Sequence, residues 1–126
     1  MTDQIADLIT RIRNATAVKK TEVLVCFSKM NQSIAEILKK EGFLTEIVVN
    51  ENDGKKSLLL KLSVSKRPSH IEQISKPGRR VYSKAKFIPK PLRGLGLVIV
   101  STPDGLLPGR EAGKRGMGGE LICKVW

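Results

Sequence analysis

Few side chains in this sequence have the type and spacing that catalysis requires. Residues 94–96 (GLG) precede an apolar run instead of following one, and residues 116–119 (GMGG) lack the Lys-Ser/Thr of a phosphate-binding loop. His70 has no relay partner near it in the sequence, and with only two isolated cysteines, Cys26 and Cys123, it does not make a zinc site. The sequence therefore predicts no catalytic residue, no bound metal and no cofactor.

The two cysteines lie singly in apolar, strand-like runs. We expect both to be buried, reduced thiols, with a disulfide between them as the alternative. The first residues, Met1 to Gln4, lack a basic head, no long apolar run follows, and no stretch is long enough to span a membrane. These features predict a cytoplasmic protein without a signal peptide and without a membrane partner.

Cations are far more prominent than groups suited to catalysis. The chain has 126 residues, with 23 Lys and Arg against 12 Asp and Glu, a net charge of +11. Residues 1–64 hold 10 basic and 8 acidic residues, and residues 65–126 hold 13 and 4, so the net charges are +2 and +9. Residues 66–93 contain nine cations and one acid, Glu72. This concentration is typical of a polyanion-binding face, and a basic surface that only maintains solubility is the alternative.

Two helices and three strands are predicted for the first half of the chain. The first helix is capped by Thr2 or Asp3, and the second begins after Ser28 and ends at Gly42. Strands are expected at 21–27, 43–49 and 57–64, with the turn cluster at 50–54 joining the last two into a hairpin. The buried helix faces follow the spacing i, i+3, i+4, i+7 and comprise Ile5, Leu8, Ile9 and Ile12, then Met30, Ile34, Ile37 and Leu38.

The second half is expected to contain mostly short strands and one short helix. Its composition changes at residues 65–69 (SKRPS), which we take as the boundary between a first domain, residues 1–64, and a second domain, residues 65–126. The prediction is an α+β fold of two small domains, the first with the order α-β-α-β-β. In the second domain, strands are expected at 71–75, 80–84, 95–101 and 120–126, turns at 76–79 and 102–105, an irregular segment at 87–91, and the helix at 108–115.

Binding of nucleic acid suits such a basic module better than a reaction does. Lys and Arg attract phosphates in a salt-dependent way, while hydroxyls and backbone amides fix the geometry. The sequence has no paired-cysteine finger or basic zipper for DNA, and no paired-aromatic motif or GxxG clamp of the common RNA-binding domains. RNA is the favoured partner. A free RNA-binding regulator, a small enzyme acting on RNA or nucleotides, and a DNA-packaging protein are the alternatives.

Four stretches of the sequence are similar to a known family. They are residues 7–15 (DLITRIRNA), 75–82 (SKPGRRVY), 94–105 (GLGLVIVSTPDG) and 109–126 (GREAGKRGMGGELICKVW). In this order, and at this length and charge, they resemble the bacterial form of small-subunit ribosomal protein eight over nearly the whole chain. The resemblance implies a structural constituent of the small ribosomal subunit, on the cytoplasmic ribosome or, for an organelle-encoded member, on the plastid ribosome.

Partners are implied by the same resemblance. The family binds a helix in the central domain of small-subunit ribosomal RNA early in assembly, and it contacts neighbouring ribosomal proteins. In some bacteria it also represses translation of its own operon by binding a messenger RNA that mimics the ribosomal site. The resemblance thus makes ribosomal RNA and ribosomal proteins the expected partners, with the operon messenger as a third.

Six site residues follow from matching the motifs one by one. The RNA-contact loop falls on Ser101, Thr102 and Gly105. The turn formed by Gly118, Gly119 and Glu120 matches as well, and Glu120 would orient the loop or accept a hydrogen bond from a base.

Three residues depart from the family pattern near this loop. Pro103 stands where a serine is common, and it has neither a hydroxyl nor an amide hydrogen to donate. Asp104 adds a negative charge close to where phosphate would lie, and Lys124 stands where the family usually has an aromatic residue.

Further candidates for RNA contact are an aromatic residue and a group of polar or cationic side chains. Tyr82 can stack or hydrogen-bond along RNA, with packing in the core as the alternative. For each cation, a merely solvated charge is the alternative to phosphate contact. The polar and cationic candidates are Arg11, Arg13, Asn14, Lys29, Arg79 and Arg80.

Overall fold

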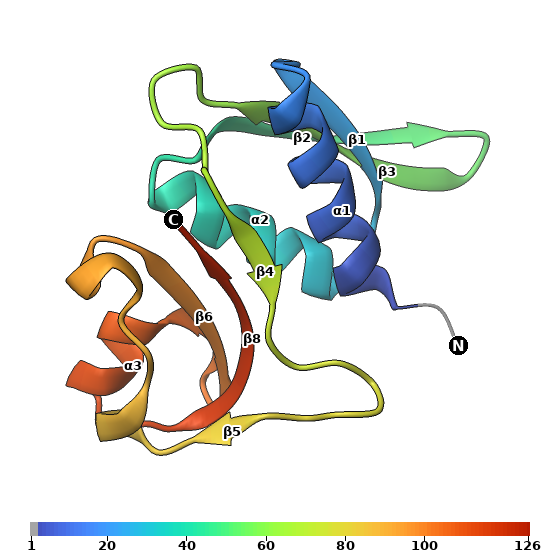
Figure 1. Ribbon diagram of the computed structural model, residues 1–126. Coiled ribbons are helices and arrows are strands. Elements are labelled where there is room, and N and C mark those ends of the chain that lie inside the picture. The colour runs from blue at the N-terminus through green and yellow to red at the C-terminus, as the bar shows by residue number, and fades with distance from the viewer. Residues whose placement is uncertain (1–2) are drawn as a thin grey trace. The chain divides into compact units, whose positions relative to one another are not determined.

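The computed structural model describes residues 3–126 and divides the chain into two compact units, Met1–Pro68 and Ser69–Trp126 (Figure 1). The division falls four residues beyond the predicted boundary because residues after 64 fold back onto the first unit. The Lys66 ammonium donates a hydrogen bond to the carbonyl of Glu41 at 2.7 Å, and the Arg67 guanidinium donates to the carbonyl of Lys20 at 3.1 Å. That the two units are separate folding domains stays a prediction.

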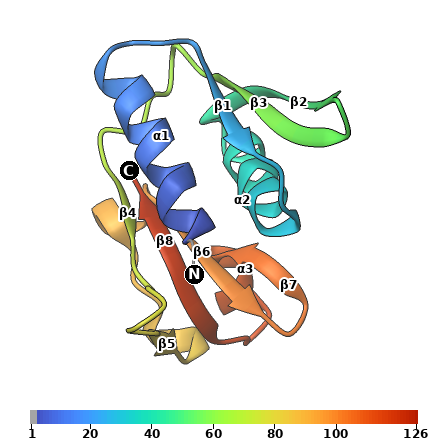
Figure 2. The ribbon, with the colours of Figure 1, turned by 90° about the vertical axis from the view of Figure 1, so that its right-hand side faces the viewer.

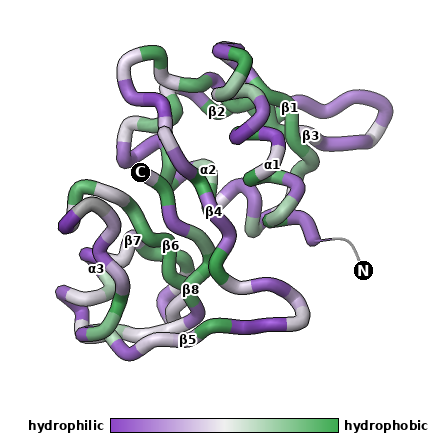
Figure 3. Tube along the Cα trace, viewed as in Figure 1, coloured by the Kyte–Doolittle hydropathy of each residue, from purple (hydrophilic) through white to green (hydrophobic). Residues whose placement is uncertain are grey.

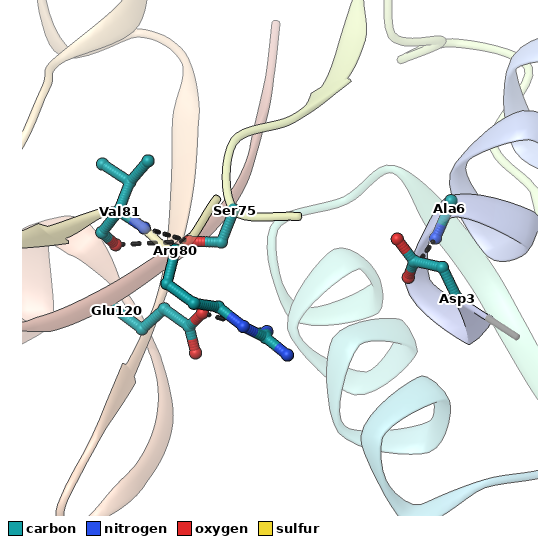
Figure 4. Close-up of polar contacts among 6 residues, drawn as sticks. All are labelled: Asp3, Ala6, Ser75, Arg80, Val81 and Glu120. Atoms are coloured by element: carbon teal, nitrogen blue, oxygen red, sulfur yellow. Dashed lines mark hydrogen bonds and ion pairs between the residues drawn. The ribbon is translucent and has the colours of Figure 1, made fainter. Parts of the chain in front are cut away.

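The first helix, α1 (Gln4–Ala17), begins where the capping residue predicts. The Asp3 carboxylate accepts a hydrogen bond from the Ala6 amide at 3.1 Å, which satisfies one of the free N–H groups of the first turn (Figure 4). Thr2, the other predicted cap, lies outside the described residues. Of the predicted stripe, Leu8, Ile9 and Ile12 are buried, and Ile5 is partly buried.

The second helix, α2 (Lys29–Lys40), is capped by the Ser28 hydroxyl, which accepts from the Asn31 amide at 2.9 Å. Just past its end Gly42 adopts φ = 91°, the left-handed conformation that favours glycine at this position. Three of the four predicted apolar positions are buried. The prediction is wrong for Met30, which lies in the first turn of the helix and has an exposed fraction of 38%. The helix α2 also buries a polar residue, Asn31, whose side-chain amide donates to the Cys26 carbonyl at 3.0 Å.

Three antiparallel strands form the sheet of the first unit, in the order β1-β3-β2. Their bounds are Glu22–Cys26 (β1), Leu44–Asn52 (β2) and Lys55–Leu62 (β3). The predicted hairpin is confirmed and is tighter than expected, since Asn52 pairs with Lys55. Asp53 and Gly54 have φ of 53° and 77°, so both central residues of the turn are left-handed. This is the conformation of two-residue hairpin turns whose twist matches that of the flanking strands.

The core of the first unit is aliphatic. One face of β3 supplies buried residues at every second position, and the stripes of α1 and α2 pack with it. Figure 3 shows this apolar colouring, in contrast to the hydrophilic tip between β2 and β3. The largest fully buried side chains are Leu8, Ile12, Ile34, Leu38, Leu58 and Leu60.

The second unit is a five-stranded antiparallel sheet with one short helix, where mostly short strands, four of them, and one short helix were predicted (Figure 2). The order is β4-β8-β6-β7, and β5 also pairs with β8, so the last strand of the chain is the central one. One strand was not predicted: β7 lies at 105–108, where the sequence indicated only a turn and a helix start. The elements are Ile71–Gln73 (β4), Tyr82–Ser83 (β5), Leu97–Thr102 (β6), Gly105–Pro108 (β7), Gly109–Lys114 (α3), Gly119–Val125 (β8), and the 3₁₀ turns Ala85–Phe87 (η1) and Pro91–Gly94 (η2).

The two cysteines have opposite environments, and the prediction that both are buried is wrong for one of them. Cys123 on β8 is buried, and burial raises the pKa of its thiol to about 12. Cys26 on β1 is exposed, because its neighbour Val25 takes the inward position of the alternating strand. Both are free thiols.

Candidate nucleic-acid interface

One end of the five-stranded sheet gathers most of the predicted RNA-binding residues of the second unit. The antiparallel register places Glu120 on β8 opposite Ser101 on β6 and opposite Tyr82 on β5. The residue before Glu120 in β8, Gly119, pairs with Ser83. Residues from three distant parts of the sequence thus come together because the central strand pairs on both sides.

Two glycines allow these strands to approach so closely. A Cβ on Gly119 would overlap the carbonyl oxygen of Ser101, and a Cβ on Gly118 would overlap the carbonyl oxygen of Ser83. No other residue type leaves room for both backbones. The glycines predicted as part of the RNA-binding turn therefore fix the geometry of that turn.

Thr102 has a structural task at the turn between β6 and β7. Its exposed fraction is 8%, and its hydroxyl donates to the Gly105 carbonyl at 2.8 Å and accepts from the Asp104 amide at 3.1 Å. Gly105 pairs with Thr102 and has φ = 100°, which suits glycine. Ser101 is partly exposed, and no hydrogen bond of its hydroxyl is found within residues 3–126. Of the two predicted hydroxyls, Ser101 is the one free to meet a ligand.

Two arginines extend the site along the basic hairpin before β5. The Arg80 guanidinium lies 3.1 Å from the Glu120 carboxylate, whose side chain is only 18% exposed (Figure 4). Glu120 is thereby oriented by a cation. Arg79 is exposed in the turn, where its backbone pairs with Lys76 in both directions, at 3.0 and 2.8 Å.

Sequence reasoning missed Ser75, which holds the base of this hairpin. The buried Ser75 hydroxyl accepts from the Val81 amide at 2.9 Å and donates to the Val81 carbonyl at 3.2 Å (Figure 4). A serine directly before the turn residues KPGR was the signal available, since serine often bonds to nearby backbone.

Tyr82 is 70% exposed, so the alternative of core packing is wrong. Its partner across the ladder is Glu120, and the next residue, Ser83, donates its hydroxyl to the Lys84 carbonyl at 2.9 Å. The ring is available for stacking or for hydrogen bonding through its hydroxyl.

The departures from the family pattern are each accommodated locally. The Asp104 carboxylate lies 3.5 Å from the Arg115 guanidinium, which also pairs with Glu111 at 2.8 Å, so the added negative charge is partly neutralised. Pro103 is exposed between Thr102 and Asp104 and removes no hydrogen bond from the ladder.

Lys124 has two partners in place of the usual aromatic packing. Its ammonium lies 5.3 Å from the centre of the Trp126 ring and 3.6 Å from the Glu72 carboxylate. His70 is exposed and stacks on Trp126 with ring centres 4.9 Å apart. The backbones of His70 and Trp126 also pair in both directions, at 2.8 and 3.0 Å.

The candidates in the first unit do not form one cluster. Arg11 and Asn14 line the same surface groove beside β1, of about 470 Å³. Arg11 is held there by the Asp7 carboxylate at 3.0 Å and by the Leu24 carbonyl at 3.3 Å. Arg13 and Lys29 are exposed but are not part of the groove lining.

Neither a metal centre nor a membrane span is found in the part of the chain that the structure describes. No group of three or more His, Cys, Asp or Glu side chains in residues 3–126 is arranged to hold a metal ion. Likewise, none of the described helices combines the length and apolarity needed to cross a bilayer.

Comparison with known proteins gives matches along the whole chain. Residues 3–126 match the family described as "Ribosomal protein S8". The small ribosomal subunit protein uS8 of Clostridium beijerinckii is 50% identical, with 100% of this chain and 98% of the relative aligned. That of Thermus aquaticus is 47% identical over 100% and 99%, and uS8c of Tetradesmus obliquus is 45% identical over 98% of each. This chain therefore belongs to the ribosomal protein S8 family.

Proposed function

We propose that this protein is a structural constituent of the small ribosomal subunit and binds its ribosomal RNA through the end of the second unit's sheet. Family membership supports a structural role and confirms the prediction that the chain is not an enzyme. It also supports a location on the ribosome, in the cytoplasm or in a plastid, since relatives include bacterial uS8 proteins and uS8c. Ribosomal RNA and neighbouring ribosomal proteins are the partners.

The observation that carries the RNA site is the register at Glu120. It brings the free hydroxyl of Ser101 and the exposed ring of Tyr82 to the two sides of one strand end. RNA duplexes display sugar hydroxyls and base edges in a shallow minor groove, which hydroxyl and aromatic side chains on a rigid sheet end can reach. The half of the chain that carries this end has a net charge of +9, which favours phosphate.

The site works by a division of tasks among its residues. Gly118, Gly119 and the internal hydroxyl of Thr102 shape the backbone, while Ser101 and Tyr82 meet the RNA. Arg79 and Arg80 attract phosphate, and Arg80 also orients Glu120.

The cations of the first unit are proposed as secondary contacts. Arg11 and Asn14 would meet phosphate together from their groove, and Arg13 and Lys29 separately. Because exposed cations each contribute little, their loss should weaken binding less than loss of the sheet-end residues.

Binding to a central-domain ribosomal RNA fragment tests the proposal, against an unrelated hairpin of the same length and across a salt series. We expect tighter binding to the central-domain RNA at every salt concentration. Equal affinity for both RNAs, falling in parallel as salt rises, would contradict it, because that behaviour needs only phosphate attraction. Duplex DNA as a competitor separates the DNA-packaging alternative.

Substitutions of Ser101 and Thr102 distinguish a residue that contacts RNA from one that holds the turn in shape. Ser101→Ala should weaken binding about tenfold without loss of stability, since it removes a hydrogen bond to RNA only. Thr102→Ser keeps the hydroxyl that holds the turn and should bind like the wild type, whereas Thr102→Val should lose both stability and affinity. If Ser101→Ala binds like the wild type, the RNA contact of Ser101 is wrong.

A free RNA-binding regulator is distinguished by sedimentation. A ribosomal constituent should sediment with small subunits after a wash in high salt, and a free regulator should remain in the supernatant. Binding of the messenger of its own operon, measured against the same central-domain fragment, tests the autoregulation that some family members perform.

A further inference from the structure

Phe87 is a large apolar side chain that is exposed to solvent. Its exposed fraction is 67%, although it is one of only three phenylalanines in the chain. The Lys86 ammonium lies 5.3 Å from the centre of its ring. An exposed aromatic ring offers a flat apolar face to any ligand that reaches this surface, and a nucleobase is one such ligand.

A backbone hydrogen bond and a buried neighbour fix the turn that carries Phe87. Phe87 ends the 3₁₀ turn η1, and its amide donates to the Lys84 carbonyl at 3.0 Å. The next residue, Ile88, is 8% exposed and is packed in the cluster formed by Val98, Val100, Ala112 and Leu121. A Cβ on Gly109 would lie only 3.0 Å from the Ile88 side chain, so the anchor is tightly seated. Because Ile88 points inward, its neighbour on the turn stays outside.

This turn directly continues the proposed RNA-binding end of the sheet. It follows β5, and Gly118 approaches it so closely that a Cβ there would lie 2.9 Å from the Lys84 Cα and 3.1 Å from the Ala85 amide nitrogen. In Figure 1 the segment runs from β5 past α3 before it enters β6. An RNA strand lying on Tyr82 and Ser83 would therefore reach Phe87 next.

The segment of sequence that carries Phe87 contains only positive charges. No acidic residue occurs between Glu72 and Asp104. Within the described residues, none of the nearby cations has a carboxylate partner; these cations are Lys84, Lys86, Lys90 and Arg93. An apolar protein partner would have to leave these charges unpaired, whereas a nucleic acid supplies both a ring and phosphates.

We propose that Phe87 is a stacking platform for an unpaired base of the bound RNA, with Lys84 and Lys86 neutralising the phosphates on either side. The proposal rests on the proposed RNA-binding function and extends that site beyond Tyr82. Base–aromatic stacking is tolerant of sequence, so the platform adds affinity rather than base selection.

The test compares Phe87→Ala with Leu95→Ala, which removes another exposed apolar side chain of the same unit, 84% exposed. Both are titrated with the central-domain RNA fragment and the unrelated hairpin. We expect Phe87→Ala to bind the central-domain RNA about tenfold more weakly with an unchanged salt slope, and Leu95→Ala to bind like the wild type. Lys84→Gln with Lys86→Gln should instead reduce the slope by about 1 to 2.

Phe87→Trp keeps a stacking ring and gives a direct signal. Its affinity should match that of the wild type, and its added indole fluorescence, relative to the wild-type protein, should be quenched by RNA. If the wild type prefers the central-domain RNA but Phe87→Ala binds equally well and Phe87→Trp is not quenched, the platform is wrong and the proposed function stands. If the wild type shows no preference, the proposed function fails and the platform fails with it.

Discussion

The two units of this chain obtain their shape from different residues. In Met1–Pro68, bulky aliphatic side chains from two helices and one face of a sheet fill the core, for example Leu8, Ile34 and Leu60. In Ser69–Trp126, the decisive positions at the sheet end are those without side chains, Gly118 and Gly119, where backbones nearly touch. Bulky side chains thus specify the first unit, whereas the absence of side chains specifies this end of the second unit's sheet.

Charge follows the same contrast. The first unit holds 12 basic and 8 acidic residues, against 11 and 4 in the second, and its Arg11 and Lys61 lie 3.0 and 3.1 Å from carboxylates. In the second unit most cations of the stretch from 76 to 93 lack such partners. Surplus charge is unfavourable to a compact fold and useful for binding a polyanion, so under the proposed function the second unit would give up stability where it binds RNA.

The largest effect on stability is expected in the core of the first unit. Leu60→Ala removes a fully buried side chain and should lower the free energy of unfolding by about 2–5 kcal/mol. Far-UV circular dichroism follows both units during urea unfolding, whereas fluorescence of Trp126 follows the second. If the units are separate folding domains, as we propose, dichroism should shift while the fluorescence midpoint stays. A common shift of both signals would show one cooperative unit.

The complementary substitution is made at the sheet end. Gly119→Ala places a Cβ onto the Ser101 carbonyl and should cost about 3 kcal/mol, because two backbones have to separate. Here the Trp126 signal should shift, and RNA affinity should fall as well. Gly78→Ala is the matched control, since a Cβ there meets nothing within 4 Å. Equal stability of the two variants would refute the claim that close backbone approach fixes the site.

What the sequence could predict depends on how far apart along the chain the interacting residues lie. The helices and the hairpin at Asp53-Gly54 follow from local rules of spacing, capping and turn chemistry, and they were predicted closely. Strand β7 was missed because its four residues begin with glycine and end with proline, both rare within strands. The exposure of Cys26 was missed because the sequence of an edge strand does not by itself show which of its alternating residues face the core. The neighbouring elements decide this.

For the candidate site, sequence matching proposed the residues, and the structure shows how differently two of them are placed. Sequence matching gave Ser101 and Thr102 the same role, and the structure gives Thr102 an internal hydrogen bond across a four-residue turn. The pairing of Arg80 with Glu120 depends on the register between two strands, β5 and β8, that are distant in sequence. No local pattern carries such information, since register is set by the assembled sheet.

The cysteines, one in each unit, give a smaller and pH-dependent difference. The unfolded Cys123 thiol ionises near its ordinary pKa of 9.0 and the folded one at about 12. Between these values the unfolded chain releases a proton that the folded chain keeps, so stability falls as pH rises, by about 1.4 kcal/mol per pH unit. Cys123→Val should lack this part of the slope. At neutral pH a thiol reagent should modify Cys26 in the folded protein and Cys123 only after unfolding.

The smallest effect is expected for a surface charge of the second unit. Lys124 and Glu72 are 36% and 49% exposed and 3.6 Å apart, so the pair contributes well under about 1 kcal/mol. Lys124→Gln should therefore change the urea midpoint hardly at all, and salt should not alter the difference. A loss comparable to that of Gly119→Ala would mean that charge, and not backbone approach, holds this unit together.

The central position of β8 has a consequence for how the protein is made. Synthesis proceeds from the N-terminal side, so β8, the strand that joins β4, β5 and β6, leaves the ribosome after all three of them. The helices and hairpin of residues 4–62 are synthesised long before that moment, while β4, β5 and β6 lack the strand that they all pair with. During this interval a basic chain with open strand edges is exposed, and early capture by RNA would shorten it.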